Sequence, residues 1–398
     1  MKKSAQASSF PTNSELPQWF GGMRSISTPK PAYQLQKVSR RELAMINAMK
    51  ILSTFAAAGA LLASSFAATA NAADTPVQTA MGAAKYKCSA PNQDSMTDVT
   101  VAALPIVSNA ALFAANDKGL FKKHGLNVEF QTLSNIPATV SAVQGGAVNF
   151  AFTSLFAVFQ ALDRKIPLTI VAPFAGIAPG FWDKMQAGVP GFTREVSALL
   201  VAPNSAIKTP GDLNGKTVAV GDVKGQAELA TRYVIKSHGG NPDSVKYVVM
   251  GFADAINALM AGQVDAAYSA EPAMTKAEQA GYKIISWVGV ETFKEGPVSA
   301  MIASSDFVLE NVETVARFNC VVREATALGR AEPDLIRATT AKMQNVDPAT
   351  LAKAVVPYFF GVMDMAGLER FYMLEKEAKF ITSDLNLNEY VIPQAIKE

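Results

Sequence analysis

The strongest constraint on the fold of this 398-residue chain is an internal repeat. Residues 142–153 align with residues 258–269 at a shift of 116, and residues 100–112 align with residues 217–229 at a shift of 117. Four pairs in the first alignment are identical, namely Ala142/Ala258, Gly146/Gly262, Val148/Val264 and Ala151/Ala267. Because two separate matches share nearly one offset, they predict two lobes built on the same plan.

Strand and helix patterns alternate within the first unit. Apolar residues 99–104 and 126–130 are typical of strands, and residues 110–123 between them have helical spacing. A second helix and strand follow at 136–144 and 148–152. Repeated βα units with short connections predict parallel sheets covered by helices. Further helical patterns that we expect to pack on the first lobe occur at 312–328, 333–344, 348–358 and 364–380.

Two similar apolar segments bracket the second repeat unit. They open with Ser197-Ala198 and Ser299-Ala300, and we interpret them as two hinge strands that cross between the lobes. The second lobe would then be an insertion in the first, with a cleft between them. The expected division is a leader with signal peptide at 1–72, a flexible mature N-terminus at 73–97, lobe 1 at 98–200, lobe 2 at 201–298, and a return to lobe 1 with C-terminal helices at 299–398.

The N-terminal segment is typical of an export signal. An apolar run at residues 51–68 follows a lysine and precedes the small residues 70–72, which predicts cleavage near Ala72. The run is rich in Ala rather than Leu, which favours a signal peptide over a membrane anchor. The long stretch before it has two explanations: translation starts later, at Met45 or Met49, or residues 39–43 (SRREL) form a twin-arginine signal.

Both explanations place the mature protein outside the cytoplasm, in the periplasm. Disulfides are stable in such a compartment, so Cys88 and Cys320 are able to pair, although nothing in the sequence requires it. Cys320 also falls in an apolar helical pattern, where a free cysteine packs as a small hydrophobic residue. The sequence leaves both states of the two cysteines open.

Composition and missing motifs exclude several functions. The formal net charge is +2, and two separate histidines with two separate cysteines make a nucleic-acid binder or a structural zinc protein improbable. The motifs G-x-S-x-G, H-E-x-x-H and G-x-G-x-x-G are absent. His124 and His238 lie at predicted helix ends, where they act as caps. We therefore expect a chain that is not an enzyme, with no catalytic residue, metal site or cofactor.

Small polar residues follow the predicted strands at corresponding points of the two units. In open parallel sheets, ligands bind beyond the carboxyl ends of the strands, where helix starts present free amide groups. The alternative is that these residues serve only as helix caps. The candidate ligand-binding residues are Ser108, Asn109, Thr153, Ser154, Phe174, Ser197, Gly225, Gln226, Ser269 and Glu271.

Residues 112–128 (LFAANDKGLFKKHGLNV) resemble the A-x-x-K-G-x-F-x-x-x-G-L-x-V signature of solute-binding proteins for nitrate, taurine, alkanesulfonates and pyrimidine thiamine precursors. The similarity continues through residues 145–151, 213–220 and 261–272. The resemblance implies an α/β fold of the type II periplasmic binding class. The ligand loops of that family correspond here to Ser108, Asn109, Thr153, Ser154, Gly225, Gln226 and Glu271.

The resemblance implies a monomeric periplasmic receptor that captures a small organic anion, such as a sulfonate, an aromatic or other organic acid, or a nitrate-like ion. Its partners would be the permease and ATPase subunits of an ABC importer, and no nucleic acid. Residues 174–194 depart from the shorter family members, and their aromatic side chains either contact a ring-bearing ligand or pack under their own loop. Lys184 or Lys224 could balance the charge of an anion.

Two other functions on the same fold remain open. One is an enzyme, either a desulfinase-like one with a Cys nucleophile or a pyrimidine-synthase-like one with a cysteine-rich iron-binding stretch. Cys88 precedes the first strand and the loop of Ser108 holds no Cys, which disfavours the desulfinase. Two isolated cysteines cannot provide an iron-binding stretch, which disfavours the pyrimidine synthase. The other is a ligand-sensing partner of a membrane receptor, which the sequence cannot separate from a transport protein.

Overall fold

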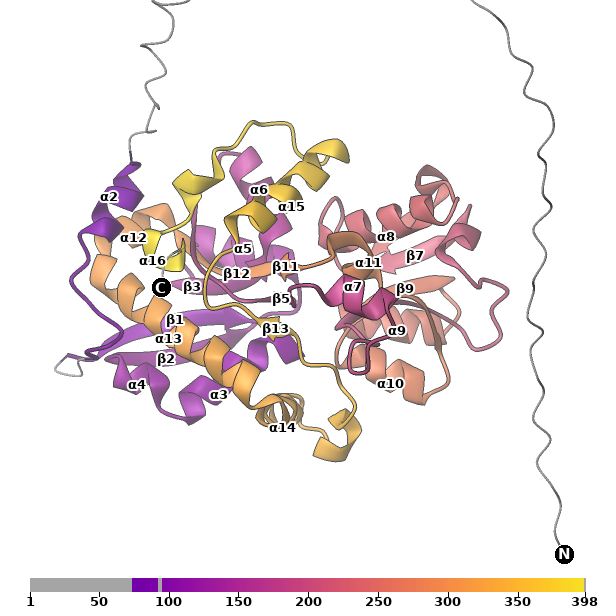
Figure 1. The fold of residues 1–398 in the computed structure, drawn as a ribbon, viewed down its shortest axis with the longest axis horizontal. Coiled ribbons are helices and arrows are strands. Elements are labelled where there is room, and N and C mark those ends of the chain that lie inside the picture. Colours follow the sequence, from indigo (N-terminus) through magenta and orange to yellow (C-terminus); the bar gives the residue numbers. More distant parts are fainter. Residues whose placement is uncertain (1–73, 92–94, 397–398) are drawn as a thin grey trace, which may run out of the picture. The chain divides into compact units, whose positions relative to one another are not determined.

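Two five-stranded sheets form the centre of the structure, a computed structural model that describes residues 74–91 and 95–396 (Figure 1). These residues belong to the compact unit that starts at Ala72. The predicted leader and signal peptide at 1–72 lie outside the described residues. The strands of the first sheet, in spatial order, are β2 (Leu126–Thr132), β1 (Thr97–Ala103), β3 (Phe150–Ser154), β12 (Ser299–Ser304) and β4 (Leu168–Pro173). Those of the second are β10 (Lys283–Ser286), β6 (Ser197–Val201), β9 (Ala266–Ala270), β7 (Thr217–Val220) and β8 (Lys246–Val249).

The two sheets have the same topology, as the internal repeat predicts. In the first sheet β1 pairs in parallel with β2 and β3, and β12 then pairs antiparallel with β3 and β4. In the second sheet β7 pairs in parallel with β8 and β9, and β6 pairs antiparallel with β9 and β10. We call the first sheet with its helices lobe 1 and the second sheet with its helices lobe 2.

The helices cover the sheets (Figure 1). Lobe 1 carries α2 (Pro76–Gly82), α3 (Ala110–Asp117), α4 (Leu120–Lys123), α5 (Ile136–Gln144), α6 (Leu155–Asp163), α12 (Ser305–Glu310), α13 (Val312–Ala331), α14 (Pro333–Gln344), α15 (Met365–Glu377) and α16 (Pro393–Ile396). Lobe 2 carries α8 (Gln226–Ser237), α9 (Phe252–Met260), α10 (Ala273–Gln279) and α11 (Val288–Phe293), and α7 (Phe181–Gln186) precedes it. Short 3-10 helices are η1 (Val107–Asn109), η2 (Pro210–Leu213), η3 (Pro242–Ser244), η4 (Pro348–Leu351) and η5 (Leu387–Tyr390).

The crossing between the lobes differs from the expectation. Residues 197–201 and 299–304 were expected to be the crossing strands, but β6 and β12 each find antiparallel partners within one sheet. The chain crosses instead in residues 174–194 and 294–298. Strand β5 (Ala175–Ile177) of the first crossing pairs with β11 (Gly296–Pro297) of the second, and β13 (Tyr358–Phe359) completes this small third sheet. Lobe 2 is therefore inserted between β4 and β12, with β6 inside it.

Matching glycines shape the repeated helix-to-strand turns. Gly146 follows α5 and Gly262 follows α9, with φ of +69° and +67°. L side chains rarely adopt this left-handed conformation, so glycine is favoured at both turns. The two turns lead into β3 and β9, which occupy the same position in their sheets. The glycine identity in the repeat thus marks a shared backbone turn.

The N-terminal segment is more ordered than expected. Residues 73–97 were expected to be flexible, yet residues 76–82 form α2, whose Met81 is fully buried. Thr75 caps this helix by accepting a hydrogen bond from the backbone of Gln78. Cys88 and Cys320 form a disulfide, which attaches this segment to α13. A buried apolar anchor and a covalent link explain the difference.

Two helix predictions need correction. The expected helix at 110–123 is divided into α3 and α4 because Gly119 lies between them in the left-handed conformation. The expected helix at 348–358 consists of the 3-10 turn η4 followed by an extended segment that ends in β13. This segment passes close to lobe 2, where the backbone N–H of Val355 donates to the Glu271 carboxylate at 3.0 Å. The tertiary contact, rather than local helical spacing, sets its conformation.

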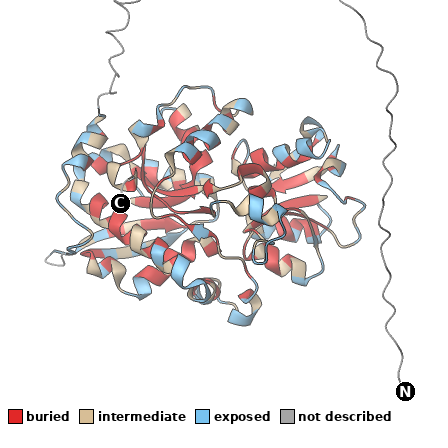
Figure 2. Ribbon diagram, in the orientation of Figure 1, coloured by how far each residue is buried: buried red, intermediate tan, exposed pale blue. Residues whose placement is uncertain are grey.

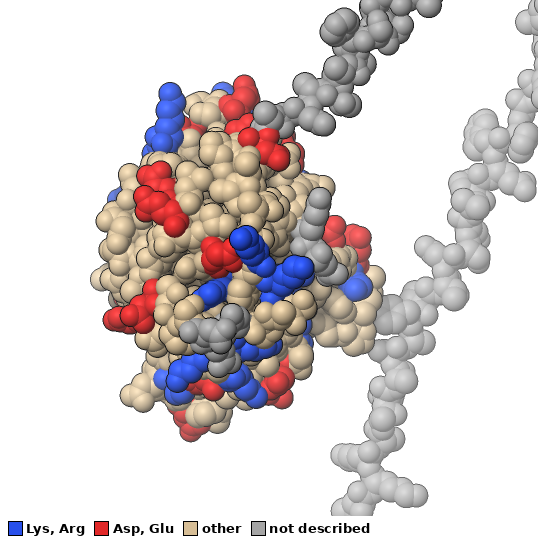
Figure 3. Space-filling model, turned by 90° about the vertical axis from the view of Figure 1, so that its left-hand side faces the viewer, with Lys and Arg blue, Asp and Glu red and all other residues tan. Residues whose placement is uncertain are grey.

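The core lies between the sheets and the inner faces of the helices (Figure 2). Lobe 1 uses large aromatic side chains there, and the rings of Phe150 and Phe318 are stacked with centroids 3.8 Å apart. On the outer face drawn in Figure 3, Lys and Arg side chains lie among Asp and Glu side chains. Ion pairs such as Lys123–Glu324 at 2.8 Å link α4 to α13 on the surface of lobe 1.

Candidate functional site

A partly open cavity of about 100 Å³, which we call the inner cavity, is lined by residues of both lobes. It lies where parallel strands end: Ser154 ends β3, Ala270 ends β9, and Gly221 follows β7. This is the sheet edge at which open α/β folds bind ligands. The lining residues include Leu104, Ser108, Asn135, Phe152, Ser154, Glu195, Val196, Ser197, Gly221, Asp222, Gln226, Phe252, Tyr268, Ala270, Gly289, Val298 and Ser299.

The two lobes line the inner cavity with equivalent positions of the repeat. At the shift of 116, Phe152 aligns with Tyr268 and Ser154 aligns with Ala270, and all four line the cavity. In the alignment of β6 with β12, Val196 and Ser197 likewise correspond to Val298 and Ser299, which also line the cavity. The inner cavity therefore lies at the pseudosymmetric junction of the two sheet edges.

Glu195 is the first of two buried carboxylates in this lining. It lies two residues before β6, and its Oε2 accepts hydrogen bonds from the Ser197 backbone N–H at 3.1 Å and from the Ser197 hydroxyl at 2.8 Å. A Cβ at Gly289 would lie 2.6 Å from that Oε2, so the glycine leaves room for the carboxylate. Burial raises the pKa of Glu195 to about 7, against the effect of the Ser197 hydrogen bonds.

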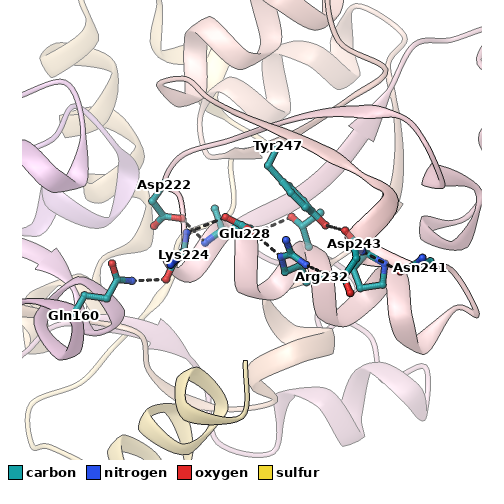
Figure 4. Close-up of polar contacts among 11 residues, drawn as sticks. Gln160, Asp222, Lys224, Glu228, Arg232, Asn241, Asp243 and Tyr247 are labelled. Atoms are coloured by element: carbon teal, nitrogen blue, oxygen red, sulfur yellow. Dashed lines mark hydrogen bonds and ion pairs between the residues drawn. The ribbon is translucent and has the colours of Figure 1, made fainter. Parts of the chain in front are cut away.

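Asp222 is the second carboxylate, in the loop between β7 and α8. The Ala227 backbone N–H donates to its Oδ1 at 2.9 Å, which caps the start of α8. Burial raises the pKa of Asp222 to about 6, although hydrogen bonds from the α8 backbone oppose the rise. Figure 4 shows Asp222 beside Lys224 and Glu228, and the Lys224 backbone N–H donates to Glu228 at 2.9 Å.

A polar chain on the outer side of α8 holds this loop. Arg232 Nε donates to Glu228 at 2.6 Å, and Arg232 Nη1 donates to Asp243 at 2.7 Å (Figure 4). The Arg232 guanidinium also lies over the ring of Tyr247, 4.8 Å from its centroid. These contacts engage Glu228 away from the cavity, so Asp222 is the acidic side chain of this loop that lines it.

Tyr268 lies between the two carboxylates in the sheet order β6-β9-β7. Its side chain is buried, which raises the pKa of its hydroxyl, and Glu195 and Asp222 add to the rise. Among the described residues that line the inner cavity there is no Lys, Arg or His. The ionisable side chains of the lining are therefore all acids.

A wider outer cavity of about 610 Å³ shares one wall with the inner one, formed by Gly176, Ile177, Glu195, Val196 and Pro357. Lys184, Arg194 and Arg330 line it, together with aromatic side chains of the 174–194 segment. Of the aromatic residues in that segment, Phe181 and Phe192 pack edge to face and line this cavity. Phe174 is fully buried. Lys294 Nζ lies over the Trp182 ring, 3.7 Å from the ring centroid.

Hydrogen bonds across the inner cavity join the lobes. The Ser154 hydroxyl at the end of β3 donates to Gln226 Oε1 at the start of α8, at 2.9 Å. Gln160 of α6 donates to the Lys224 carbonyl, a contact drawn in Figure 4, and also to Glu375 of α15 at 2.9 Å. These bonds hold the loop of Asp222 against lobe 1, which corresponds to a closed arrangement.

Four of the ten predicted site residues line the inner cavity: Ser108, Ser154, Ser197 and Gln226. Three of the others stabilise its wall. The Asn109 amide donates to the Leu104 carbonyl, the Ser269 hydroxyl to the Phe252 carbonyl, and the Thr139 hydroxyl to Thr153. The remaining three are Phe174 in the core, Gly225 at the N-cap of α8, and Glu271, whose carboxylate accepts from Thr275 and Val355.

Sequence reasoning missed both carboxylates and both aromatic residues of lobe 2, Phe252 and Tyr268. A signal was available for the acids, because Glu195 stands two residues before an apolar strand and Asp222 two residues after another. An acidic residue beside a strand usually faces solvent, so this pattern did not distinguish a buried site from a surface loop.

The described part of the chain contains neither a metal-binding cluster nor a membrane-spanning helix. Within residues 74–91 and 95–396, no group of three or more His, Cys, Asp or Glu side chains is placed to hold a metal ion. In the same part of the chain, no helix has the length and hydrophobicity that crossing a membrane requires. The inner cavity is thus a site of carboxylates, hydroxyl groups and aromatic rings.

Solved structures with the same fold include proteins that are named for the solutes they bind. The alkanesulfonate-binding protein of Xanthomonas axonopodis is 16% identical, with a TM-score of 0.60 over 76% of this chain and 99% of that one. The nitrate-binding protein of Synechocystis is 13% identical, with a TM-score of 0.61 over 76% of this chain and 88% of that one. At these identities the likeness shows the fold, which is the predicted type II periplasmic binding fold.

Sequence comparison agrees with the fold. A Brucella abortus protein provisionally named as a binding protein is 26% identical over 240 residues, which cover 60% of this chain and 68% of that protein. The model of the family described as NMT1/THI5 like matches residues 107–179 and 190–336, more than half of the chain. With the two-lobed fold, these matches support a solute-binding function. The chain belongs to the NMT1/THI5-like family.

Proposed function

We propose that this protein is an exported receptor that captures a small solute in the inner cavity and delivers it to the permease of an ABC importer. The observation that carries the proposal is a cavity lined by both lobes at their strand ends. Fold relatives named for binding alkanesulfonate and nitrate support the same role. The predicted leader at 1–72 supports export.

Solute capture would proceed by closure of one lobe on the other. In an open form, the contacts of Ser154 with Gln226 and of Gln160 with the Lys224 carbonyl are broken. A solute that contacts both walls favours the closed form, because it gains interactions there that the open form lacks. The paired crossing strands β5 and β11 are the connection about which the lobes would rotate.

We propose a binding role rather than an enzymatic one. The similar proteins of known structure are named as binding proteins, and the two cysteines are joined in a disulfide remote from the inner cavity lining. A receptor returns its solute chemically unchanged, whereas an enzyme converts it. The lobe boundaries at the two crossings and the monomeric state are parts of the same proposal.

A cavity-filling variant tests this proposal. Ala270→Phe places an aromatic ring at the end of β9, where Ala270 lines the inner cavity. Ala261→Phe is the matched control, because Ala261 is exposed after α9. A bound solute raises the melting temperature by mass action. We expect solutes that raise it for the wild type and the control to have no effect on Ala270→Phe, and to be recovered unchanged. Conversion of the solute, or equal shifts in both variants, would contradict the proposal.

A further inference from the structure

The acidic side chains of the inner cavity have no basic partner in its lining. Glu195 and Asp222 are 5% and 9% exposed. The charged neighbours that act on them are also acidic, Glu271 on Glu195 and Glu228 on Asp222. Burial of a carboxylate away from a cation costs free energy. A solute that carries the missing positive charge would recover this free energy on binding.

The topology brings the two carboxylates to one side of the cavity. Glu195 precedes β6 and Asp222 follows β7, and β6 runs antiparallel to the strand β9 that separates them. The start of β6 and the end of β7 therefore meet at the same edge of the second sheet. Tyr268 in β9 lies between them and is influenced by both charges.

We infer that the inner cavity binds a small organic cation, with its protonated nitrogen held by Glu195 and Asp222 and its apolar body against Phe152 and Phe252. This inference deepens the proposed function and rests on it. N–H groups of a protonated amine or amidine form charge-assisted hydrogen bonds with carboxylates. The aromatic faces of Phe152, Phe252 and Tyr268 also attract a cation.

The chain itself occupies positions that an anionic solute would need. An anion binds well at a helix N-terminus, but Asp222 accepts from the first turn of α8, and Asn135 and Ser154 accept from the first turns of α5 and α6. The family resemblance implied an organic anion, and the amide groups at these helix starts were expected to be free. The observed capping makes the inner cavity unfavourable for a negative charge.

The nearby basic side chains do not reverse this conclusion. Arg194 forms an ion pair with Glu278, and the Arg330 guanidinium donates to the Phe359 carbonyl. Lys184 lies over the ring of Phe192, 4.7 Å from its centroid. All three line the outer cavity and not the inner one. Glu195 lines both cavities, and the charged group that acts on it is Glu271.

The repeat indicates that the fold does not require either carboxylate. In the Ser-Ala alignment of β6 with β12, Glu195 aligns with Pro297. At the shift of 117, Asp222 aligns with Pro105. Prolines therefore stand at the two positions that correspond to these acids. Because the shared topology forms without acids at these positions, Glu195 and Asp222 are specific to the cavity wall of lobe 2.

Cavity volume limits the size of the solute. A water molecule needs about 10–15 Å³ measured in this way, so about 100 Å³ accommodates a solute of roughly ten non-hydrogen atoms. Benzamidine, benzamide and benzoate have this size and nearly the same shape, and they carry a positive charge, no charge and a negative charge. They form a matched set of probes for the charge preference of the cavity.

The test measures binding of these three probes by calorimetry and thermal shift. A second set adds small alkyl and cyclic amines, nitrate, taurine and alkanesulfonates. We expect benzamidine to bind at least about tenfold more tightly than benzamide, and benzoate to bind more weakly than both. Glu195→Gln and Asp222→Asn keep the size of each side chain and remove its charge. Each should weaken benzamidine at least about tenfold and leave benzamide within about twofold.

The controls separate the outcomes. Glu369→Gln removes an exposed carboxylate of α15 and should leave all affinities unchanged. Binding of an anion that Ala270→Phe abolishes would overturn the cation inference and leave the solute-binding proposal intact. If no compound of either charge binds the wild type, both the inference and the proposed function fail. Equal loss of benzamidine and benzamide affinity in the two charge variants would also overturn the inference, because it would indicate damage to the cavity shape.

Discussion

The two lobes share a topology but differ in what they place at their common edge and in their cores. Lobe 1 contributes neutral side chains to the inner cavity, whereas lobe 2 contributes Glu195, Asp222 and the hydroxyl of Tyr268. In the cores, Phe150 in β3 corresponds to Ala266 in β9, and both are fully buried. The repeat therefore determines where the edge lies, and a few substitutions determine the charge of the cavity lining.

The first prediction concerns the buried aromatic stack of Phe150 in lobe 1, whose counterpart in lobe 2 is Ala266. Phe150→Ala should lower the free energy of unfolding by about 3–5 kcal/mol, because it removes a ring stacked on Phe318 and leaves a cavity. Denaturant titration measures the change. Leu309→Ala, at a 40% exposed position of α12, is the control and should change stability by less than about 0.5 kcal/mol. A loss below about 1 kcal/mol for Phe150→Ala would show that lobe 1 does not depend on this stack.

The second prediction concerns the disulfide that is present in lobe 1. Replacing both cysteines, as Cys88→Ser with Cys320→Ala, should lower the free energy of unfolding by about 2–4 kcal/mol, because the unfolded chain is no longer constrained. Hydrogen exchange should show the lost protection mainly in α2 and α13. Equal loss in the strands of lobe 2 would contradict the assignment of this effect to one lobe.

The third prediction is a pH dependence from the acids of lobe 2. The folded-state pKa of Glu195 is about 7, above its ordinary value, so the folded protein binds this proton more tightly than the unfolded chain. Stability of the solute-free protein should therefore fall as pH rises from 5 to 7 and level off above the folded pKa, by up to about 3 kcal/mol from Glu195. Asp222, with a pKa of about 6, acts in the same direction.

Glu195→Gln isolates the contribution of that one carboxylate. Its neighbours Glu271 and Tyr268 remain, and so does the buried Glu375, whose pKa is raised by burial to about 9. Thermal melts from pH 5 to 8 should show a smaller fall for the variant than for the wild type, with the variant as stable or more stable at pH 8. Parallel pH profiles of the two proteins would refute the assignment.

The smallest expected effect is at the contact between the lobes. Gln226→Ala removes the acceptor of the Ser154 hydroxyl and should cost about 0.5–1.5 kcal/mol of closure, with the melting temperature of the solute-free protein nearly unchanged. Small-angle X-ray scattering should show a larger radius of gyration for this variant. Glu271→Ala is a useful contrast, because its carboxylate accepts from Thr275 and Val355 and its loss should lower the melting temperature. An unchanged radius for Gln226→Ala would remove Gln226 from the closure contacts.

The two lobes could be predicted from the sequence because each repeated segment carries local signals of backbone conformation. The turn glycines Gly146 and Gly262 and the spacing of apolar residues report backbone conformation directly. The Ser-Ala openings of β6 and β12 were also correctly seen as similar, but their similarity indicates equivalent places in two sheets rather than a crossing. Strand partners depend on tertiary contacts, which cannot be inferred from the sequence of either segment alone.

The site was less predictable, for a related reason. Hydroxyl residues at strand ends are common to both lobes, so Ser154 and Ser197 could be placed at the edge from pattern alone. The chemistry of the cavity depends on the burial of Glu195 and Asp222, which results from Gly289, the α8 start and the opposite lobe packing around them. A linear sequence does not show that burial.

Native mass spectrometry of the exported protein tests the central claim most directly. The wild type, isolated under mild conditions, should carry a small solute that is released unchanged on denaturation and has a mass typical of a cation of roughly ten non-hydrogen atoms. The double variant Glu195→Gln with Asp222→Asn should be folded and lack this solute. An anionic solute retained equally by the two proteins, or a wild type that never carries a solute and binds none of the probes, would contradict the account.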